Sequence, residues 1–273
     1  MRAWVDGRIL TDPADPVVTV FDHGFTVGDG VFETVKVVDG EAFALTRHLD
    51  RLRRSAEGLG LTPPNPATLR AAVSDVLAGQ DLSLGRIRVT LTGGDSPLGS
   101  ARGDSGPTLA VVAGPMESAP ATTAVVTVPW PRNERGALSG LKTTSYAENV
   151  IALARAAERG ASEAIFANTV ATLCEGTGSN VFYVVRGELR TPSLRSGCLA
   201  GITRDLVLEW YGGVECDEPM DVLAEADEVF LASTTRDVQG VHQCDERTLE
   251  APGPITQDVA VVWAKQAAAD IDP

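Results

Sequence analysis

The chain is poor in positive charge, cysteine and histidine, and it has no long apolar run. Its 23 lysines and arginines face 37 acids, for a formal net charge of -14, which argues against binding to nucleic acid or to anionic membranes. Four widely spaced cysteines and three scattered histidines argue against a structural zinc site or a disulfide framework. No run of about 18 apolar residues occurs, and residues 1–6 do not resemble a secretory signal. We therefore expect a cytoplasmic protein whose partner is a small molecule or another protein.

Lysine is the scarcest of the charged residue types. Only Lys36, Lys142 and Lys265 occur, so arginine supplies 20 of the 23 basic side chains. Lys142 stands just before a predicted helix, where a charge alone could have been provided by arginine. An amine, unlike a guanidinium, can deprotonate and form a Schiff base with a carbonyl group. Lys142 is therefore either a reactive amine or an ordinary surface lysine.

The first 113 residues predict an α+β domain. Strands are expected on either side of Asp6-Gly7 and Asp39-Gly40, because Asp-Gly favours tight hairpin turns. A helix is expected from about Thr46, as its N-cap, and another over 67–78. Strands follow over 86–92 and 108–113. Residues 114–121 are rich in Gly, Pro and Ser, which predicts a linker between two domains.

Residues 122–273 predict a second domain that mixes strands and helices around a barrel-like sheet. Strands are expected over 124–128, 163–167, 180–185, 188–191 and 228–232, and helices over 146–159, 203–210 and 256–269. In the first of these helices the apolar spacing predicts one packed face. That face comprises Ala147, Val150, Ile151, Ala154 and Ala157.

Several segments could bind an anion. Gly201 and Thr203 begin a helix, where free backbone N–H groups and the helix dipole favour phosphate, although a plain capped turn fits as well. Thr234 and Thr235 follow an apolar strand and offer hydroxyl groups. On the early helix, His48, Arg51 and Ser55 lie beside the apolar stripe, so Arg51 could be held against the protein and grip a phosphate. A solvated arginine is the alternative.

Two further charged positions could meet a ligand. Glu175 lies in a glycine-rich turn before a strand, and is either an exposed acid or a buried carboxylate facing a cation such as a protonated ring nitrogen. Arg88 shares the polar face of the strand 86–92 with Arg86. It could receive a substrate carboxylate or simply face water.

Five segments in order along the chain together resemble the signatures of the class IV aminotransferases. This family includes branched-chain transaminases, D-amino acid transaminases and 4-amino-4-deoxychorismate lyases. The segments are 21–34 (FDHGFTVGDGVFET), 48–52 (HLDRL), Lys142, 175–182 (EGTGSNVF) and 201–204 (GITR). The resemblance runs from about Trp4 to Val241.

This resemblance implies a two-domain α+β protein of fold type IV, with a small N-terminal domain, a larger C-terminal domain and pyridoxal 5'-phosphate bound between them in a homodimer. Lys142 matches the Schiff-base lysine, which also acts as general base, and Glu175 matches the partner of the pyridine nitrogen. The matched phosphate ligands are Arg51, Gly201, Ile202, Thr203 and Thr234. The matched substrate residues are Phe32, Arg88 and Thr235.

The substrate would be a small amine or amino acid, and three features bear on which one. The loop Ser96-Pro97-Leu98-Gly99-Ser100 lacks the arginine and histidine typical of D-amino acid transaminases. Ala147 stands where branched-chain enzymes usually have a tyrosine, with Tyr146 one place earlier. The segment after Lys142 is closest to the lyase-like actinobacterial branch. We therefore favour aminodeoxychorismate lyase, which serves folate synthesis, over a transaminase.

Overall fold

The computed structural model describes all 273 residues, which form two compact units. The first unit comprises Met1–Glu117, Leu141–Tyr146 and Ile271–Pro273, and the second comprises Ser118–Gly140 and Ala147–Asp270. The chain thus leaves the first unit within the expected linker 114–121. The chain then returns to the first unit twice, at Leu141–Tyr146 and at Ile271–Pro273. A single boundary at the linker therefore does not describe the two units. No helix has the length and apolar composition needed to cross a bilayer.

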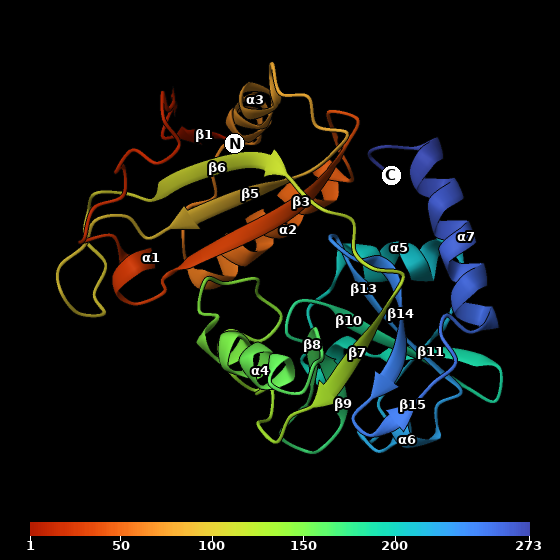
Figure 1. The fold of residues 1–273 in the computed structure, drawn as a ribbon. Coiled ribbons are helices and arrows are strands. Elements are labelled where there is room, and N and C mark those ends of the chain that lie inside the picture. Colours follow the sequence, from red (N-terminus) through yellow and green to blue (C-terminus); the bar gives the residue numbers. More distant parts are fainter. The chain divides into compact units, whose positions relative to one another are not determined.

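The first unit is an antiparallel sheet of six strands with two helices on one side. The strand order is β2-β1-β6-β5-β3-β4, and β6, β5 and β3 lie side by side in Figure 1. Helix α2 packs on β3, and α3 packs on β1 and β6. The elements are β1 (Arg2–Val5), β2 (Arg8–Ile9), α1 (His23–Thr26), β3 (Gly30–Val38), β4 (Glu41–Ala42), α2 (Leu45–Leu59), α3 (Pro66–Leu77), β5 (Leu84–Thr92) and β6 (Thr108–Pro115).

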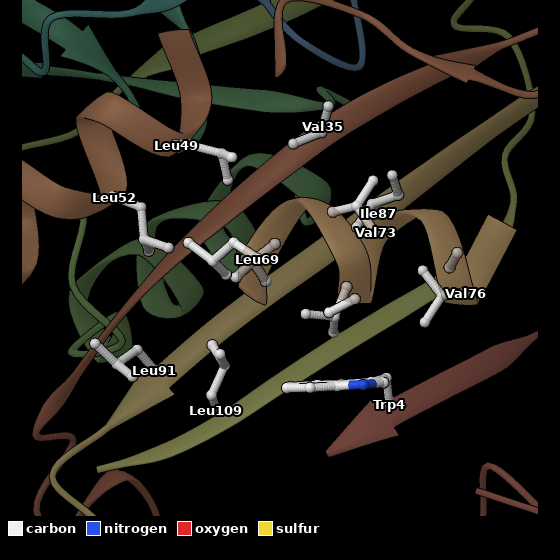
Figure 2. Close-up of a cluster of buried hydrophobic side chains, with 14 of the residues drawn as sticks. Trp4, Val35, Leu49, Leu52, Leu69, Val73, Val76, Ile87, Leu91 and Leu109 are labelled. Atoms are coloured by element: carbon white, nitrogen blue, oxygen red, sulfur yellow. The ribbon is translucent and has the colours of Figure 1, made fainter. Parts of the chain in front are cut away.

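The core of this unit lies between the sheet and its helices. Strand β5 alternates as expected, with Ile87, Val89 and Leu91 buried. These side chains meet those of α2 and α3, including Leu52 and Val73, as Figure 2 shows. Because successive residues of a strand point to opposite faces, burying one face of β5 leaves Arg86 and Arg88 together on the other.

The second unit is built on a curled sheet of nine strands. Its order is β12-β11-β10-β13-β14-β7-β8-β9, with β15 paired to β14. Strand β9 also contacts β10 through a tight turn, which brings distant parts of the sheet together. The elements are β7 (Thr122–Thr127), α4 (Ala147–Ala157), β8 (Glu163–Ala167), β9 (Leu173–Gly176), β10 (Asn180–Val185), β11 (Glu188–Pro192), η1 (Leu194–Ser196), α5 (Ile202–Trp210), β12 (Val214–Cys216), α6 (Val222–Glu225), β13 (Glu228–Ser233), β14 (Asp237–Cys244), β15 (Arg247–Thr248) and α7 (Pro254–Ala269).

The α+β class and the barrel-like second sheet are confirmed, but the packed face expected for α4 is wrong. Val150 and Ile151 are 66% and 57% exposed, whereas Asn149, Ala152 and Ala156 are buried. Ala152 and Ala156 pack among the apolar side chains beside β8. Small residues allow α4 to approach the strand closely, and the same face carries Asn149 inward.

The N-cap expected at Thr46 is also wrong. Helix α2 begins at Leu45, after Ala44 in a left-handed conformation, and no side chain at that position caps it. The tail supplies the missing acceptor instead: Thr46 N donates to Asp272 Oδ1 at 2.7 Å, and Ala44 N donates to Ile271 O at 2.7 Å. A residue far away in sequence therefore takes the capping role, which local sequence could not reveal.

Candidate active site

Lys142 is held along the edge of strand β3. Phe32 N donates to Lys142 O at 3.0 Å, Lys142 N donates to Ser55 Oγ at 3.2 Å, and Thr144 N donates to Gly30 O at 2.8 Å. These bonds fix the backbone of Lys142 in the first unit, together with the rest of Leu141–Tyr146, although the longer segments before and after it belong to the second unit. The side chain is only partly exposed, and its Nζ lies 4.3 Å from the centroid of the Phe32 ring.

An aromatic and cationic group surrounds this amine. Phe32 and Tyr146 meet edge to face, with ring centroids 5.1 Å apart, and the Tyr146 centroid lies 5.9 Å from Lys142 Nζ. The Arg88 guanidinium lies over the Phe32 ring, its Cζ 3.3 Å from the centroid. Removal from bulk water lowers the pKa of Arg88 to about 10, against the opposing effects of Tyr146 and Glu33. Arg88 therefore stays a cation at neutral pH, and although its side chain is exposed, its guanidinium is held against the Phe32 ring.

Arg51 is buried, as its position beside the apolar stripe of α2 suggested, and it forms a two-pronged ion pair. Its Nε and Nη2 donate to Glu33 Oε1 and Oε2 at 2.7 and 2.8 Å. His48 Nδ1 lies 2.7 Å from Glu33 Oε2. Glu33 is 0% exposed, and Arg51 is 6% exposed. The planar fork of the guanidinium matches the carboxylate, so Glu33 fixes the orientation of Arg51.

The charge of this group is set by opposing effects. Burial opposes ionisation of Glu33, but Arg51 and His48 more than offset it and lower the pKa of Glu33 to about 2. Burial also lowers the pKa of His48, against the attraction of Glu33 and together with the repulsion of Arg51 and Lys142. At neutral pH we therefore treat Glu33 as ionised and His48 as neutral. We call Phe32, Glu33, His48, Arg51, Arg88, Lys142 and Tyr146 the first-unit cluster.

In the second unit, Glu175 meets a cation, as one of its two alternatives anticipated. Its Oε1 lies 3.2 Å from Arg132 Nε, and its Oε2 accepts a hydrogen bond from Leu199 N at 2.9 Å. The side chains of Glu175 and Arg132 are 13% and 18% exposed. Glu175 is thus neither a solvated turn residue nor fully enclosed, and its carboxylate is held between a cation and a backbone donor.

Asn180 links the Glu175 turn to the start of helix α5. Asn180 Nδ2 donates to Leu199 O at 2.9 Å, and a Cβ at Gly201 would lie 1.9 Å from Asn180 Oδ1. Only glycine allows this approach. Helix α5 has Gly201 as its N-cap and no side-chain cap, so the backbone N–H groups of its first turn are available to an anion. Ile202 and Thr203 stand in that turn and are buried.

The end of strand β13 lies beside the same asparagine. Asn180 pairs with Ala232, the residue before Ser233. Ser233 Oγ is buried without a hydrogen-bond partner, and Thr234 and Thr235 follow in a partly exposed turn. An orphaned hydroxyl next to an uncapped helix start is what a bound anion would satisfy. We call Glu175, Asn180, residues 199–203 and residues 233–235 the second-unit cradle.

Glu163 holds the glycine-rich turn of this cradle in place. The buried carboxylate accepts hydrogen bonds from Thr177 N at 2.9 Å, from Ser179 Oγ at 2.8 Å and from Thr177 Oγ1. Gly176 N donates to Ser179 O at 2.7 Å and closes the turn. The turn between β9 and β10 is therefore built around a buried acid.

The structure collects the expected residues in two groups. Lys142, Arg51, Phe32 and Arg88 lie in the first-unit cluster. Glu175, Gly201, Ile202, Thr203, Thr234 and Thr235 lie in the second-unit cradle.

Sequence reasoning missed the roles of Glu33, Arg132, Asn149 and Asn180. Glu33 could have been found, because it lies on the apolar face of β3 with Val31, Val35 and Val37, where an acid requires a cation. Arg132 gave no such signal.

Comparison with known proteins identifies the family. The model for amino-transferase class IV matches residues 30–244. A putative branched-chain-amino-acid aminotransferase of Methanocaldococcus jannaschii is 33% identical over 91% of this chain and 90% of its own, and an aminodeoxychorismate lyase of Bacillus subtilis is 28% identical over 86% and 84%. The PLP-bound structure of a hypothetical aminotransferase from Mycobacterium tuberculosis has a TM-score of 0.87 at 28% identity and covers 100% of both chains. The chain belongs to the class IV aminotransferases, enzymes that depend on pyridoxal 5'-phosphate.

Proposed function

We propose that this enzyme is a 4-amino-4-deoxychorismate lyase, which releases pyruvate and leaves 4-aminobenzoate for folate synthesis. The observation that carries the proposal is the arrangement around Lys142. The flat face of Phe32 lies 4.3 Å from the amine, and the Arg88 cation lies on that same ring. A six-membered diene ring with one carboxylate on the ring and a second on its enolpyruvyl ether suits an aromatic surface with an adjoining guanidinium. The similarity to the B. subtilis lyase is consistent with this choice.

The residues present fit pyridoxal phosphate. The uncapped start of α5 and the orphaned Ser233 hydroxyl suit a phosphate, and Glu175 suits a protonated ring nitrogen. We propose that Gly201, Ile202, Thr203, Thr234 and Arg51 hold the phosphate and that Lys142 binds the aldehyde carbon. When bound, the cofactor supplies an electron-accepting ring.

The substrate's amine would displace Lys142 from the aldehyde carbon, and the released Lys142 amine would then act as the general base. The lysine amine removes the proton from the substrate carbon that bears the amino group. The electron pair left behind forms the new ring double bond as the neighbouring C–O bond breaks. The departing enolpyruvate takes up a proton and becomes pyruvate, so the step needs no oxidant or reductant. Phe32, Arg88 and Thr235 would orient the substrate ring and its carboxylates.

Amino acid transamination is the second candidate. The M. jannaschii relative, 33% identical, carries a branched-chain aminotransferase name, and Arg88 could equally bind the carboxylate of an amino acid. A D-amino acid substrate has less support, because the loop 96–100 (SPLGS) offers no cationic side chain.

We also propose that the enzyme works as a cytoplasmic homodimer. Val20, Phe21 and Phe25 of the first unit are 67%, 51% and 74% exposed, and neighbouring apolar side chains of this size favour association. A second copy of the chain would cover them. Sedimentation of the cofactor-loaded enzyme as a monomer at micromolar concentration would contradict this.

Product analysis separates the two activities. The purified enzyme is supplied either with aminodeoxychorismate or with a panel of L- and D-amino acids and a keto acid. We expect 4-aminobenzoate and pyruvate in equal amounts, with slow amino transfer. Arg88→Leu should impair lyase turnover, because it removes the guanidinium that lies on the Phe32 ring. Arg86→Leu, two residues away on the same face of β5 and exposed like Arg88, should not. Rapid transamination without 4-aminobenzoate would overturn the lyase proposal in favour of the second candidate.

A further inference from the structure

Arg132 lies beside Glu175 but is not explained by any role assigned so far. It stands between β7 and α4 in the second unit, and its Nε is buried without a hydrogen bond, 3.2 Å from Glu175 Oε1. A partly buried guanidinium next to the acid expected to face the ring nitrogen must influence that acid electrostatically, because the two charges are close and only partly solvated.

Contacts on three further sides fix the position of Arg132. Its backbone N donates to Ala167 O at 2.8 Å, its guanidinium lies over the Phe166 ring with Cζ 4.3 Å from the centroid, and its Nη1 donates to Asn149 Oδ1 at 2.8 Å. Asn149 Nδ2 in turn donates to Thr177 O at 2.7 Å, in the turn that follows Glu175. The charge is therefore held in one place relative to the Glu175 turn.

This network accounts for the unexpected orientation of helix α4. The helix exposes Val150 and Ile151 while burying Asn149, a choice that apolar burial alone would not favour. Burying Asn149 allows one amide to bond both the Arg132 guanidinium and the Thr177 carbonyl.

We propose that Arg132 is a positioning residue that acts through Glu175, keeping this carboxylate ionised and oriented so that the proton stays on the cofactor's ring nitrogen. The inference rests on the proposed pairing of Glu175 with that nitrogen. A partly buried carboxylate facing a pyridine can take the proton itself, which leaves both groups neutral. The Arg132 charge favours the ionised carboxylate, so the proton remains on nitrogen and the ring keeps its capacity to accept electrons.

The test locates the proton directly. Enzyme loaded with pyridoxal phosphate carrying ¹⁵N in the ring is examined by NMR, in the wild type and in Arg132→Met, Arg132→Lys and Arg135→Met. We expect the ¹⁵N shift of a pyridinium in the wild type. The control Arg135→Met should show the same shift, because Arg135 is exposed and pairs with Glu134. Arg132→Met should move the shift toward that of neutral pyridine, and Arg132→Lys, which retains a charge, should move it less.

Cofactor affinity supplies a second readout. Arg132→Met should weaken binding of pyridoxal phosphate by about tenfold or more. It should leave nearly unchanged the binding of the carbocyclic analogue, in which CH replaces the ring nitrogen. A purely structural role would weaken both equally and leave the ¹⁵N shift unmoved, which would overturn the proposal. If Arg132→Met does not fold, Arg132→Lys takes its place in the test. The proposal would be overturned if this variant had the ¹⁵N shift of the wild type and bound both cofactors more weakly to the same extent.

Glu175→Gln distinguishes this inference from the assignment on which it rests. If Glu175→Gln changes the ¹⁵N shift and Arg132→Met does not, Arg132 has only a structural role. If neither substitution changes the shift, Glu175 does not face the ring nitrogen, and the assignment of Glu175 itself fails.

Discussion

The first-unit cluster and the second-unit cradle hold charge in different ways. In the first, side chains neutralise one another: Arg51 balances the charge of the fully buried Glu33, which His48 also contacts. In the second, Arg132 faces Glu175, but the anion site is formed by backbone groups and glycine. Helix α5 starts uncapped at Gly201, and Leu199 N donates to Glu175 Oε2. Removing one partner of a buried ion pair leaves an uncompensated buried charge, which strongly destabilises the fold. A site formed by backbone groups loses its ligand contacts instead when a substitution changes its shape. The two regions should therefore respond to different perturbations.

The largest effect expected concerns Glu33. Glu33→Gln leaves the Arg51 guanidinium buried without its counter-charge, which should lower the free energy of unfolding by about 3–5 kcal/mol. The matched control is Glu57→Gln, which removes an exposed ion pair to Arg53 on helix α2, the helix that carries Arg51. It should lower the free energy of unfolding by about 0.5 kcal/mol or less. Urea unfolding of the cofactor-free proteins measures both. Equal effects of the two substitutions would show that the buried pair has no special importance.

Acid should act on the same cluster. Because the folded pKa of Glu33 is lowered to about 2 from 4.5, its contribution, roughly 3 kcal/mol, is complete above about pH 4.5 and is lost as pH falls toward 2.

The lowered pKa of His48 adds to this loss. Below about pH 6.5 the unfolded chain takes up a proton that folded His48 resists, so stability also declines there. Urea unfolding from pH 7 to 3 should show a steady decrease, and the decrease should be smaller in Glu33→Gln. A variant with the same pH slope as the wild type would contradict this account.

A change of shape should damage the second-unit cradle. Gly201→Ala places a methyl group where Asn180 Oδ1 now lies, so Asn180 must move, at a cost of about 1–3 kcal/mol. Its effect on cofactor binding should exceed its effect on folding, because the phosphate donors begin at this residue.

Gly178→Ala is the matched control, since a Cβ there meets nothing within 4 Å. Equilibrium dialysis of pyridoxal phosphate against both variants decides the matter. Unchanged cofactor affinity in Gly201→Ala would remove the helix start from the phosphate site.

The smallest effect expected concerns the cap of α2. Asp272→Ala removes the acceptor for Thr46 N and should cost about 1 kcal/mol. Asp50→Ala, an exposed substitution on the same helix, should cost less. Thermal unfolding compares the two, and equal melting temperatures would show that the tail contributes nothing to the helix that carries Arg51.

The features that the sequence could predict depend on residue patterns within one helix or strand. The features that it could not predict depend on contacts between residues far apart in the chain. Alternation identified the buried face of β5, and the apolar stripe of α2 placed Arg51 against the protein. Both signals lie within one element. The cap of α2 comes from Asp272, more than 200 residues away, and the inward face of α4 is decided by Asn149 bonding Arg132 and Thr177. Polar contacts between distant segments leave no periodicity in the sequence, so these features required the fold.

The most direct test of the central claim asks which lysine carries the cofactor. Borohydride reduction of the pyridoxal phosphate-loaded enzyme, followed by peptide mass analysis, is unambiguous here because the chain has only three lysines. We predict that the label appears on the peptide containing Lys142 and is absent from Lys142→Ala. A label on Lys36 or Lys265, or an undiminished label in Lys142→Ala, would contradict the account.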